Sequence, residues 1–203
     1  MPPRRAALLP VIAASALCAR PAEAHIVSSR LGDFYAGAVH PLTGLQDVVL
    51  WIALGVLAGT QPAARARWLV AVFPAGLVAG FLLGLANGVT GGVAAVDAGC
   101  MVALGGLIAM AVRLPAPALA AIAFALGLVR GAANAGGVGP DTDAALFAAG
   151  FAAAGYVAIT LLPAAVLAFC RPGAGWRGVA LRAGGSWIAA IGIMAGGYAL
   201  AGR

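Results

Sequence analysis

Charged side chains are scarce in this sequence, and lysine is absent from it altogether. Only 9% of the 203 residues are charged, whereas 63% are apolar, and the mean hydropathy is +1.03. A soluble domain is about one quarter charged and about half apolar, so this composition excludes an ordinary soluble protein. The twelve basic residues are all arginines, and because few of them cluster we expect no nucleic-acid partner. The composition is that of an integral membrane protein, whose first partner is the lipid bilayer.

Motifs for catalysis and nucleotide binding are missing as well. No G-x-x-x-x-G-K-[ST] loop occurs, which argues against an ATP site. We find no nucleophile–base pair and no cofactor motif, and therefore predict that the protein is not an enzyme and holds no tightly bound cofactor. Cys100 and Cys170 lie in different apolar segments and outside any C-x-x-C pair, so we interpret both as packing residues.

The N-terminus has the pattern of a signal peptide. Two arginines precede an apolar stretch over residues 6–19, and an A-x-A cleavage site ends at Ala24. We expect a signal peptide over residues 1–24 and a transmembrane domain over residues 25–203 that begins with His25. An uncleaved signal anchor is the alternative.

Six apolar segments follow, each close to the ~20 residues that a helix needs to cross the hydrocarbon core. They cover roughly residues 40–59, 68–87, 91–112, 116–134, 144–170 and 179–201. Loops that contain proline, glycine or aspartate separate them. The predicted fold class is all-α: a polytopic membrane helix bundle with six transmembrane helices after a cleaved signal peptide.

The arginines predict the orientation of this bundle. With the mature N-terminus outside, the cytoplasmic loops contain six arginines and no acid, whereas the external side contains three arginines. The six are Arg65, Arg67, Arg113, Arg171, Arg177 and Arg182. This bias agrees with the positive-inside rule, so we expect a bacterial inner-membrane protein with a periplasmic mature N-terminus.

Glycines recur at helical spacing in two segments. Gly76, Gly80 and Gly84 repeat every four residues in the second segment, as Gly192 and Gly196 do in the sixth. Small residues at this spacing let helices approach closely in lipid, so we interpret both sets as helix-packing faces. Contacts between copies in a homo-oligomer would produce the same pattern.

Polar residues inside the segments gather at one depth. At about 1.5 Å per residue, Asp47, Asp97 and Arg130 all fall in the outer third of the membrane. The same layer contains Gln46, Asn87, Asn134 and His40, with His25 on the short external arm. Because ionisable residues in a membrane are costly and usually face the bundle interior, we predict a polar vestibule that opens to the periplasm.

Two interpretations of this layer are open. In one, Arg130 pairs with Asp97 or Asp47 and locks helices together. In the other, the two carboxylates and His40 are ligands for a divalent cation, since carboxylate and imidazole groups bind such ions. If cleavage follows Ala24, the α-amine and imidazole of His25 supply a further metal ligand.

These features resemble the HupE/UreJ proteins, bacterial inner-membrane permeases associated with nickel supply to hydrogenase and urease. The resemblance covers residues 25–203, and its most specific part is His40-Pro41-x-x-Gly44 at the entry of the first segment. The resemblance implies a six-helix permease that takes a nickel or cobalt ion as its substrate.

Several positions depart from the family pattern. Gln46 and Asp47 stand where the family has an aspartate followed by a histidine, and Arg130 and Asn134 stand at the two histidines of an HGxxHG-like segment. Asp97 matches the family's acid in the third segment, and Pro163 occupies the position of a histidine in the fifth. Arginine cannot ligate a metal, so Arg130 would repel a divalent ion where the family binds one.

We therefore predict uptake or binding of a transition-metal ion from the periplasm, with His40, Asp47 and Asp97 in contact with the ion. Asn87 and Asn134 would supply neutral oxygens, and Arg130 would set the charge of the site. Two alternatives are a membrane subunit that transports nothing and stabilises a larger complex, and a transporter of a non-metal solute such as an anion or protons.

Overall fold

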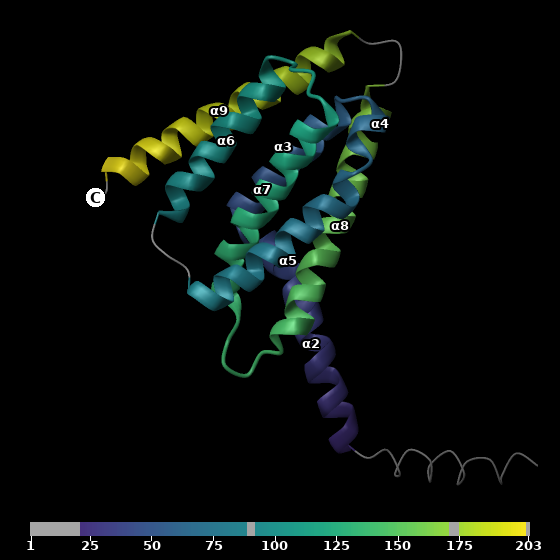
Figure 1. Ribbon diagram of the computed structural model, residues 1–203, viewed down its shortest axis with the longest axis vertical. Coiled ribbons are helices and arrows are strands. Elements are labelled where there is room, and N and C mark those ends of the chain that lie inside the picture. Colours follow the sequence, from purple (N-terminus) through teal and green to yellow (C-terminus); the bar gives the residue numbers. More distant parts are fainter. Residues whose placement is uncertain (1–20, 89–91, 171–174, 202–203) are drawn as a thin grey trace, which may run out of the picture.

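The computed structural model describes residues 21–88, 92–170 and 175–201, and of residues 21–31 it describes the backbone alone. Within this part the chain is helical and contains no β-strand. The elements are α2 (Pro21–Thr43), α3 (Leu45–Gly59), α4 (Ala63–Ala66), α5 (Leu69–Asn87), α6 (Val93–Ala109), α7 (Ala116–Asn134), the short 3-10 helix η1 (Ala135–Gly137), α8 (Ala144–Phe169) and α9 (Trp176–Ala201). Figure 1 shows them as a bundle from which α2 extends toward the N-terminus. The all-helical prediction is confirmed.

The number of membrane spans differs from the predicted six. Four helical segments are long and apolar enough to cross a membrane: Ala63–Asn87, Ala116–Gly137, Ala144–Phe169 and Trp176–Ala201. The third predicted segment forms α6, which has only 17 residues. The first forms α3, which has 15 residues and is long enough to cross a membrane only together with the end of α2. The described residues therefore give four candidate spans, or five if the bent pair counts as one.

The bend in the first predicted segment explains most of this difference. α2 and α3 meet at an angle of 81° instead of forming one straight helix. Pro41 lies in the last turn of α2, and Gly44 between the two helices has an extended backbone (φ −97°, ψ 113°). Proline removes a backbone donor and an extended residue breaks the helical ladder, so the chain turns at the entry of α3.

The predicted signal peptide lies mostly within residues 1–20, outside the described residues. α2 begins at Pro21 and continues through the predicted cleavage point after Ala24 as one helix. The side chain of His25 is also outside the described part.

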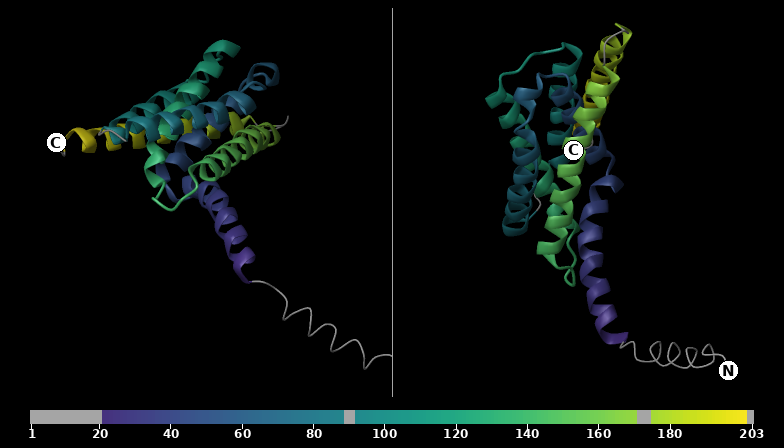
Figure 2. Two further views of the ribbon diagram at one scale, coloured as in Figure 1. Left: turned by 60° about the horizontal axis from the view of Figure 1, so that its bottom comes forward. Right: turned by 90° about the vertical axis from the view of Figure 1, so that its right-hand side faces the viewer.

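Close helix pairs build the bundle. α5 packs along α7, α6 packs along α9, and α8 packs against both α2 and α3. Figure 2 shows α2 beside α8, and Figure 1 shows the α6–α9 pair on the side of the bundle away from α8. α3 is the central helix, because nine of its fifteen residues are buried, including Leu50, Leu54 and Leu57.

Glycines form the seams between the pairs. A Cβ atom added at Gly76 would lie 2.6 Å from the Phe124 carbonyl oxygen of α7, and one at Gly80 would overlap the Leu128 carbonyl. Gly84 meets α7 in the same way, so the glycine face of α5 is its contact with α7. In the α6–α9 pair a Cβ at Gly192 would lie 2.8 Å from the Ala98 carbonyl oxygen, while Gly196 has more room. At these glycines the two helix backbones are closer than any larger side chain would permit. Such close backbone contacts stabilise the packing of transmembrane helices.

The α2–α8 seam was not anticipated from the sequence. A Cβ at Gly37 would overlap the Phe147 carbonyl, and one at Gly150 would overlap the Phe34 carbonyl. Gly37 lies before the first predicted segment, in a region interpreted as an external arm. In the structure this arm is helical and packs against α8 as closely as α5 packs against α7.

Candidate functional site

Three helices bring four polar side chains together inside the bundle. Asp47 comes from α3, Asp97 from α6, and Arg130 and Asn134 from α7. Their exposed fractions are 3%, 4%, 6% and 5%. We call these four residues the ion network.

Asp47 and Arg130 form the strongest contact of the ion network. Arg130 Nε lies 2.7 Å from Asp47 Oδ1, and Arg130 Nη2 lies 2.8 Å from Asp47 Oδ2. This is the bidentate arrangement that planar guanidinium and carboxylate groups favour. Asn134 Nδ2 adds contacts of 3.1 and 3.2 Å to the two oxygens of Asp47. Asp47 is therefore the acceptor in four short contacts.

Asp97 is bound more sparsely. Arg130 Nη1 donates to Asp97 Oδ1 at 2.6 Å. Within the described residues, this is the one hydrogen bond of the Asp97 side chain. The guanidinium thus bridges two carboxylates on different helices. With both acids ionised, the ion network contains two negative charges and one positive charge, a net charge of −1.

The local sequence explains how each group reaches its place. Asp47 lies in the first turn of α3, where free backbone N–H groups and the helix dipole favour a negative charge. A Cβ at Gly44 would lie 3.1 Å from Asp47 Oδ2, so the glycine leaves room for the carboxylate. Arg130 and Asn134 lie one turn apart on the same face of α7, and Asn134 Nδ2 also donates to the Arg130 carbonyl oxygen at 2.7 Å.

The other residues predicted for the site lie outside the ion network. His40 is half-buried at the end of α2, and its ring packs edge-on against Phe147 at 5.3 Å between centroids. Gln46 is exposed, and exposed Asn87 donates to the Leu83 carbonyl oxygen at 2.9 Å. The four residues of the ion network are enclosed and bound to one another, and Arg130 donates to three of the four carboxylate oxygens. In the part of the chain that the structure describes, His40, Gln46 and Asn87 are not hydrogen-bonded to them.

The described residues contain no group of three or more His, Cys, Asp or Glu side chains close enough together to hold a metal ion. Asp47 and Asp97 are the two carboxylates that come together in the bundle, and Arg130 binds both of them. A divalent ion that used both of them would have to displace the guanidinium.

Two buried residues that carry a polar group, Trp51 and Gln61, were not singled out from the sequence. Trp51 lies one turn beyond Asp47, packs against Phe73 at 5.6 Å and Phe151 at 5.8 Å, and its Nε1–H has no hydrogen-bond partner within the described residues. Gln61 is 3% exposed and binds the α6–α7 loop at the opposite end of α3. Gln61 sits in a polar, proline-bearing loop pattern, which gave no signal of burial.

Comparison with known proteins gives one result. Searches of the curated proteins and of the solved structures found no match. A family model described as "HupE / UreJ protein" matches residues 12–195, which includes every helix that contributes to the ion network and nearly all of the described structure. The chain therefore belongs to the HupE/UreJ family.

Proposed function

We propose that the protein binds or transports a divalent transition-metal ion, nickel or cobalt, taken from the periplasmic side of a bacterial inner membrane. Its family suggests a metal-related membrane transporter or accessory protein. Nickel or cobalt follows from the resemblance of the His40-Pro41-x-x-Gly44 entry to the permeases of that family.

The unequal binding of the two carboxylates supports a cation site. Asp47 is the acceptor in four contacts, whereas Asp97 accepts one hydrogen bond and leaves Oδ2 without a donor from the described residues. Burial of an uncompensated charge is costly, so an ion network with a net charge of −1 attracts one further cation. Asp97 is the group that such a cation would meet.

Arg130 then acts as an internal competitor for the ion. A cation at Asp97 Oδ2 leaves the Asp47–Arg130 pair intact, whereas contact with both acids requires the guanidinium to turn away. We interpret the observed arrangement as the closed form, in which Arg130 occupies the carboxylates. His40 at the end of α2 is the imidazole that an entering ion would contact, and His25 is a further candidate ligand.

The test is calorimetric titration of the purified protein with Ni²⁺, Co²⁺, Mn²⁺ and Zn²⁺, repeated on Asp97→Asn and His40→Ala, with Gln46→Ala as an exposed neutral control. Asn at position 97 can still accept the hydrogen bond from Arg130 Nη1, so the fold should persist. We expect saturable nickel or cobalt binding that is lost in Asp97→Asn and retained in Gln46→Ala. Absence of binding by all four ions, or equal binding by Asp97→Asn, would refute the proposal.

The second candidate function is a non-transporting membrane subunit that stabilises a larger complex. The observation that favours it is the buried Arg130 bridge itself, because a guanidinium between two acids from different helices is also a helix lock. Copurification of a stoichiometric partner, together with an Asp97→Asn variant that changes thermal stability but no ion binding, would select this function.

A further inference from the structure

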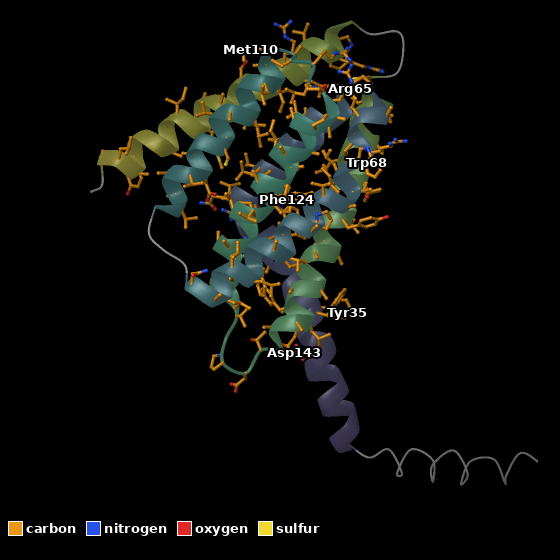
Figure 3. All side chains as sticks on the ribbon, in the orientation of Figure 1. Tyr35, Arg65, Trp68, Met110, Phe124 and Asp143 are labelled. Carbon is orange, nitrogen blue, oxygen red and sulfur yellow. The ribbon has the colours of Figure 1, made fainter. Side chains whose placement is uncertain are left out.

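Positive charge gathers at one end of the bundle. Figure 3 shows nitrogen-bearing side chains around the labelled Met110 and Arg65, at the end opposite the labelled Asp143. Five of the arginines whose side chains the structure describes, all except Arg130, flank the helices at this end: Arg65, Arg67, Arg113, Arg177 and Arg182. Both ion pairs of the described structure involve Arg130, so Arg65, Arg113 and Arg182 have no described carboxylate partner.

A cavity of about 450 Å³ opens among these arginines, where the ends of α3, α6, α8 and α9 meet. Arg113 and Arg182 line it together with the apolar side chains Ile108, Val179 and Leu181. The cavity is therefore lined by two guanidinium groups on one part of its surface and by apolar side chains on another.

The backbone on both sides of Arg113 is held firmly. Gln61 Nε2 donates to the Val112 carbonyl oxygen, and the Leu114 N–H donates to Gln61 Oε1, each at 3.0 Å. Arg65 Nη1 also donates to the Leu114 carbonyl oxygen at 3.1 Å. Arg113 itself has no described hydrogen bond or ring contact, so a fixed loop presents an arginine whose five donors are unused.

Arg182 is fixed from the other side of the cavity. Its Nε donates to the Ala109 carbonyl oxygen at 2.8 Å, one of the carbonyls left free at the C-terminus of α6. Its two Nη groups have no described hydrogen bond. The α6 terminus is itself shaped by Ala111, which has a left-handed backbone (φ 52°) and lines the same cavity.

We propose that this cavity binds the phosphate headgroup of an anionic phospholipid, with Arg113 and Arg182 on the phosphate and the apolar wall against the start of an acyl chain. Basic pockets between transmembrane helices recognise such headgroups, and arginine forks match phosphate geometry. The apolar wall favours a lipid over a free phosphate ion, which would leave Ile108, Val179 and Leu181 unmatched.

The test is native mass spectrometry of the full-length protein in zwitterionic detergent, titrated with phosphatidylglycerol and, in parallel, with phosphatidylcholine. The variant is Arg113→Gln, which removes no described contact. The matched control is Arg67→Gln, because Arg67 is an exposed arginine at the same end, stacks over Trp68 at 5.0 Å and does not line the cavity. Arg113→Lys tests whether charge alone restores binding.

We expect selective retention of phosphatidylglycerol that weakens about tenfold in Arg113→Gln, as befits loss of one charge-assisted hydrogen bond, and changes less than about twofold in Arg67→Gln. Arg113→Lys should recover part of the affinity. Equal weakening in both glutamine variants, or equal retention of phosphatidylcholine, would overturn the proposal. Complete displacement of the lipid by an equal concentration of inorganic phosphate would overturn its lipid assignment.

Discussion

The two aspartates of the ion network should differ sharply in what they contribute to stability. In Asp47→Asn, the amide can accept from one nitrogen of Arg130, but its NH₂ group must then face either Arg130 Nη2 or Asn134 Nδ2, both of which are donors. The bidentate pair is lost, and Arg130 is left with Asp97 alone. The substitution weakens two charge-assisted hydrogen bonds, each worth about 1.5–3 kcal/mol, and sets two donors against each other, so we expect a loss of about 3–5 kcal/mol.

Asp97→Asn should cost far less. Its Oδ1 can still accept from Arg130 Nη1, and Arg130 stays neutralised by Asp47. Either substitution removes the surplus negative charge of the ion network, so the difference between them comes from the hydrogen bonds. We expect a loss of about 1 kcal/mol, the net value of one hydrogen bond. The difference of at least about 2 kcal/mol corresponds to roughly 30-fold in the unfolding equilibrium constant.

The measurement is reversible unfolding in mixed micelles of a mild detergent and sodium dodecyl sulfate, followed by tryptophan fluorescence. Gln46→Ala is the control, because Gln46 is adjacent to Asp47 but exposed. An Asp47→Asn loss below about 1 kcal/mol, or one no larger than that of Asp97→Asn, would refute the assignment of the buried bidentate pair. A double-mutant cycle between Asp47→Asn and Arg130→Gln should give a coupling energy of about 1–3 kcal/mol.

Three further substitutions, with Gly99→Ala as a control for the first, test the packing of the bundle by the same unfolding assay. Gly80→Ala should destabilise by about 2 kcal/mol or more, because the new Cβ overlaps the backbone of α7, whereas Gly99→Ala, which meets nothing within 4 Å, should be neutral or stabilising. Ala111→Gly should stabilise by about 0.5–1 kcal/mol, since glycine adopts the left-handed backbone without strain, and a loss would contradict this. Trp51→Phe should cost less than about 1.5 kcal/mol, because the indole N–H that it removes is buried without a partner in the described residues; a larger loss would reveal a partner.

The helical bundle could be predicted because its signal is spread over many residues. All six predicted apolar segments are helical in the described residues, although α3 and α6 are too short to cross a membrane alone. The four-residue glycine spacing of α5 marked its contact with α7. Such patterns need only local sequence. The Gly37–Gly150 seam was missed because the glycines of each helix, Gly32 and Gly37 in α2 and Gly150 and Gly155 in α8, are five residues apart and do not show the four-residue spacing of a packing face.

The bend at Gly44 shows a different limit. Hydropathy over residues 40–59 is continuous, so the sequence favoured one straight span. The structure divides it, since Pro41 and Gly44 end one helix and begin another at 81°. Both residues belong to the His40-Pro41-x-x-Gly44 family signature. Their effect on the backbone predicts the bend better than the hydropathy predicts a straight helix.

The sequence predicted how far along its helix each polar residue lies, but not which polar groups bind one another. Counting residues along each segment placed Asp47, Asp97 and Arg130 at one level, and the structure brings them into contact. The sequence could not decide which acid Arg130 prefers, because that depends on how α7 is rotated. The helix-packing glycines set that rotation: Gly127 and Gly131 lie against α5.

The glycine seams and the ion network have complementary roles in any conformational change. The seams hold α5 to α7 and α6 to α9 by backbone contacts that tolerate no added Cβ, so each pair should move as a unit. Asp97 and Arg130 join these two units through a single short hydrogen bond between α6 and α7. A cation that bound Asp97 would compete with that bond and loosen the α6–α9 pair from α7. In the proposed cation site, Asp97 would therefore also be one of the connections between the two helix pairs, beside the packing of α6 on α3.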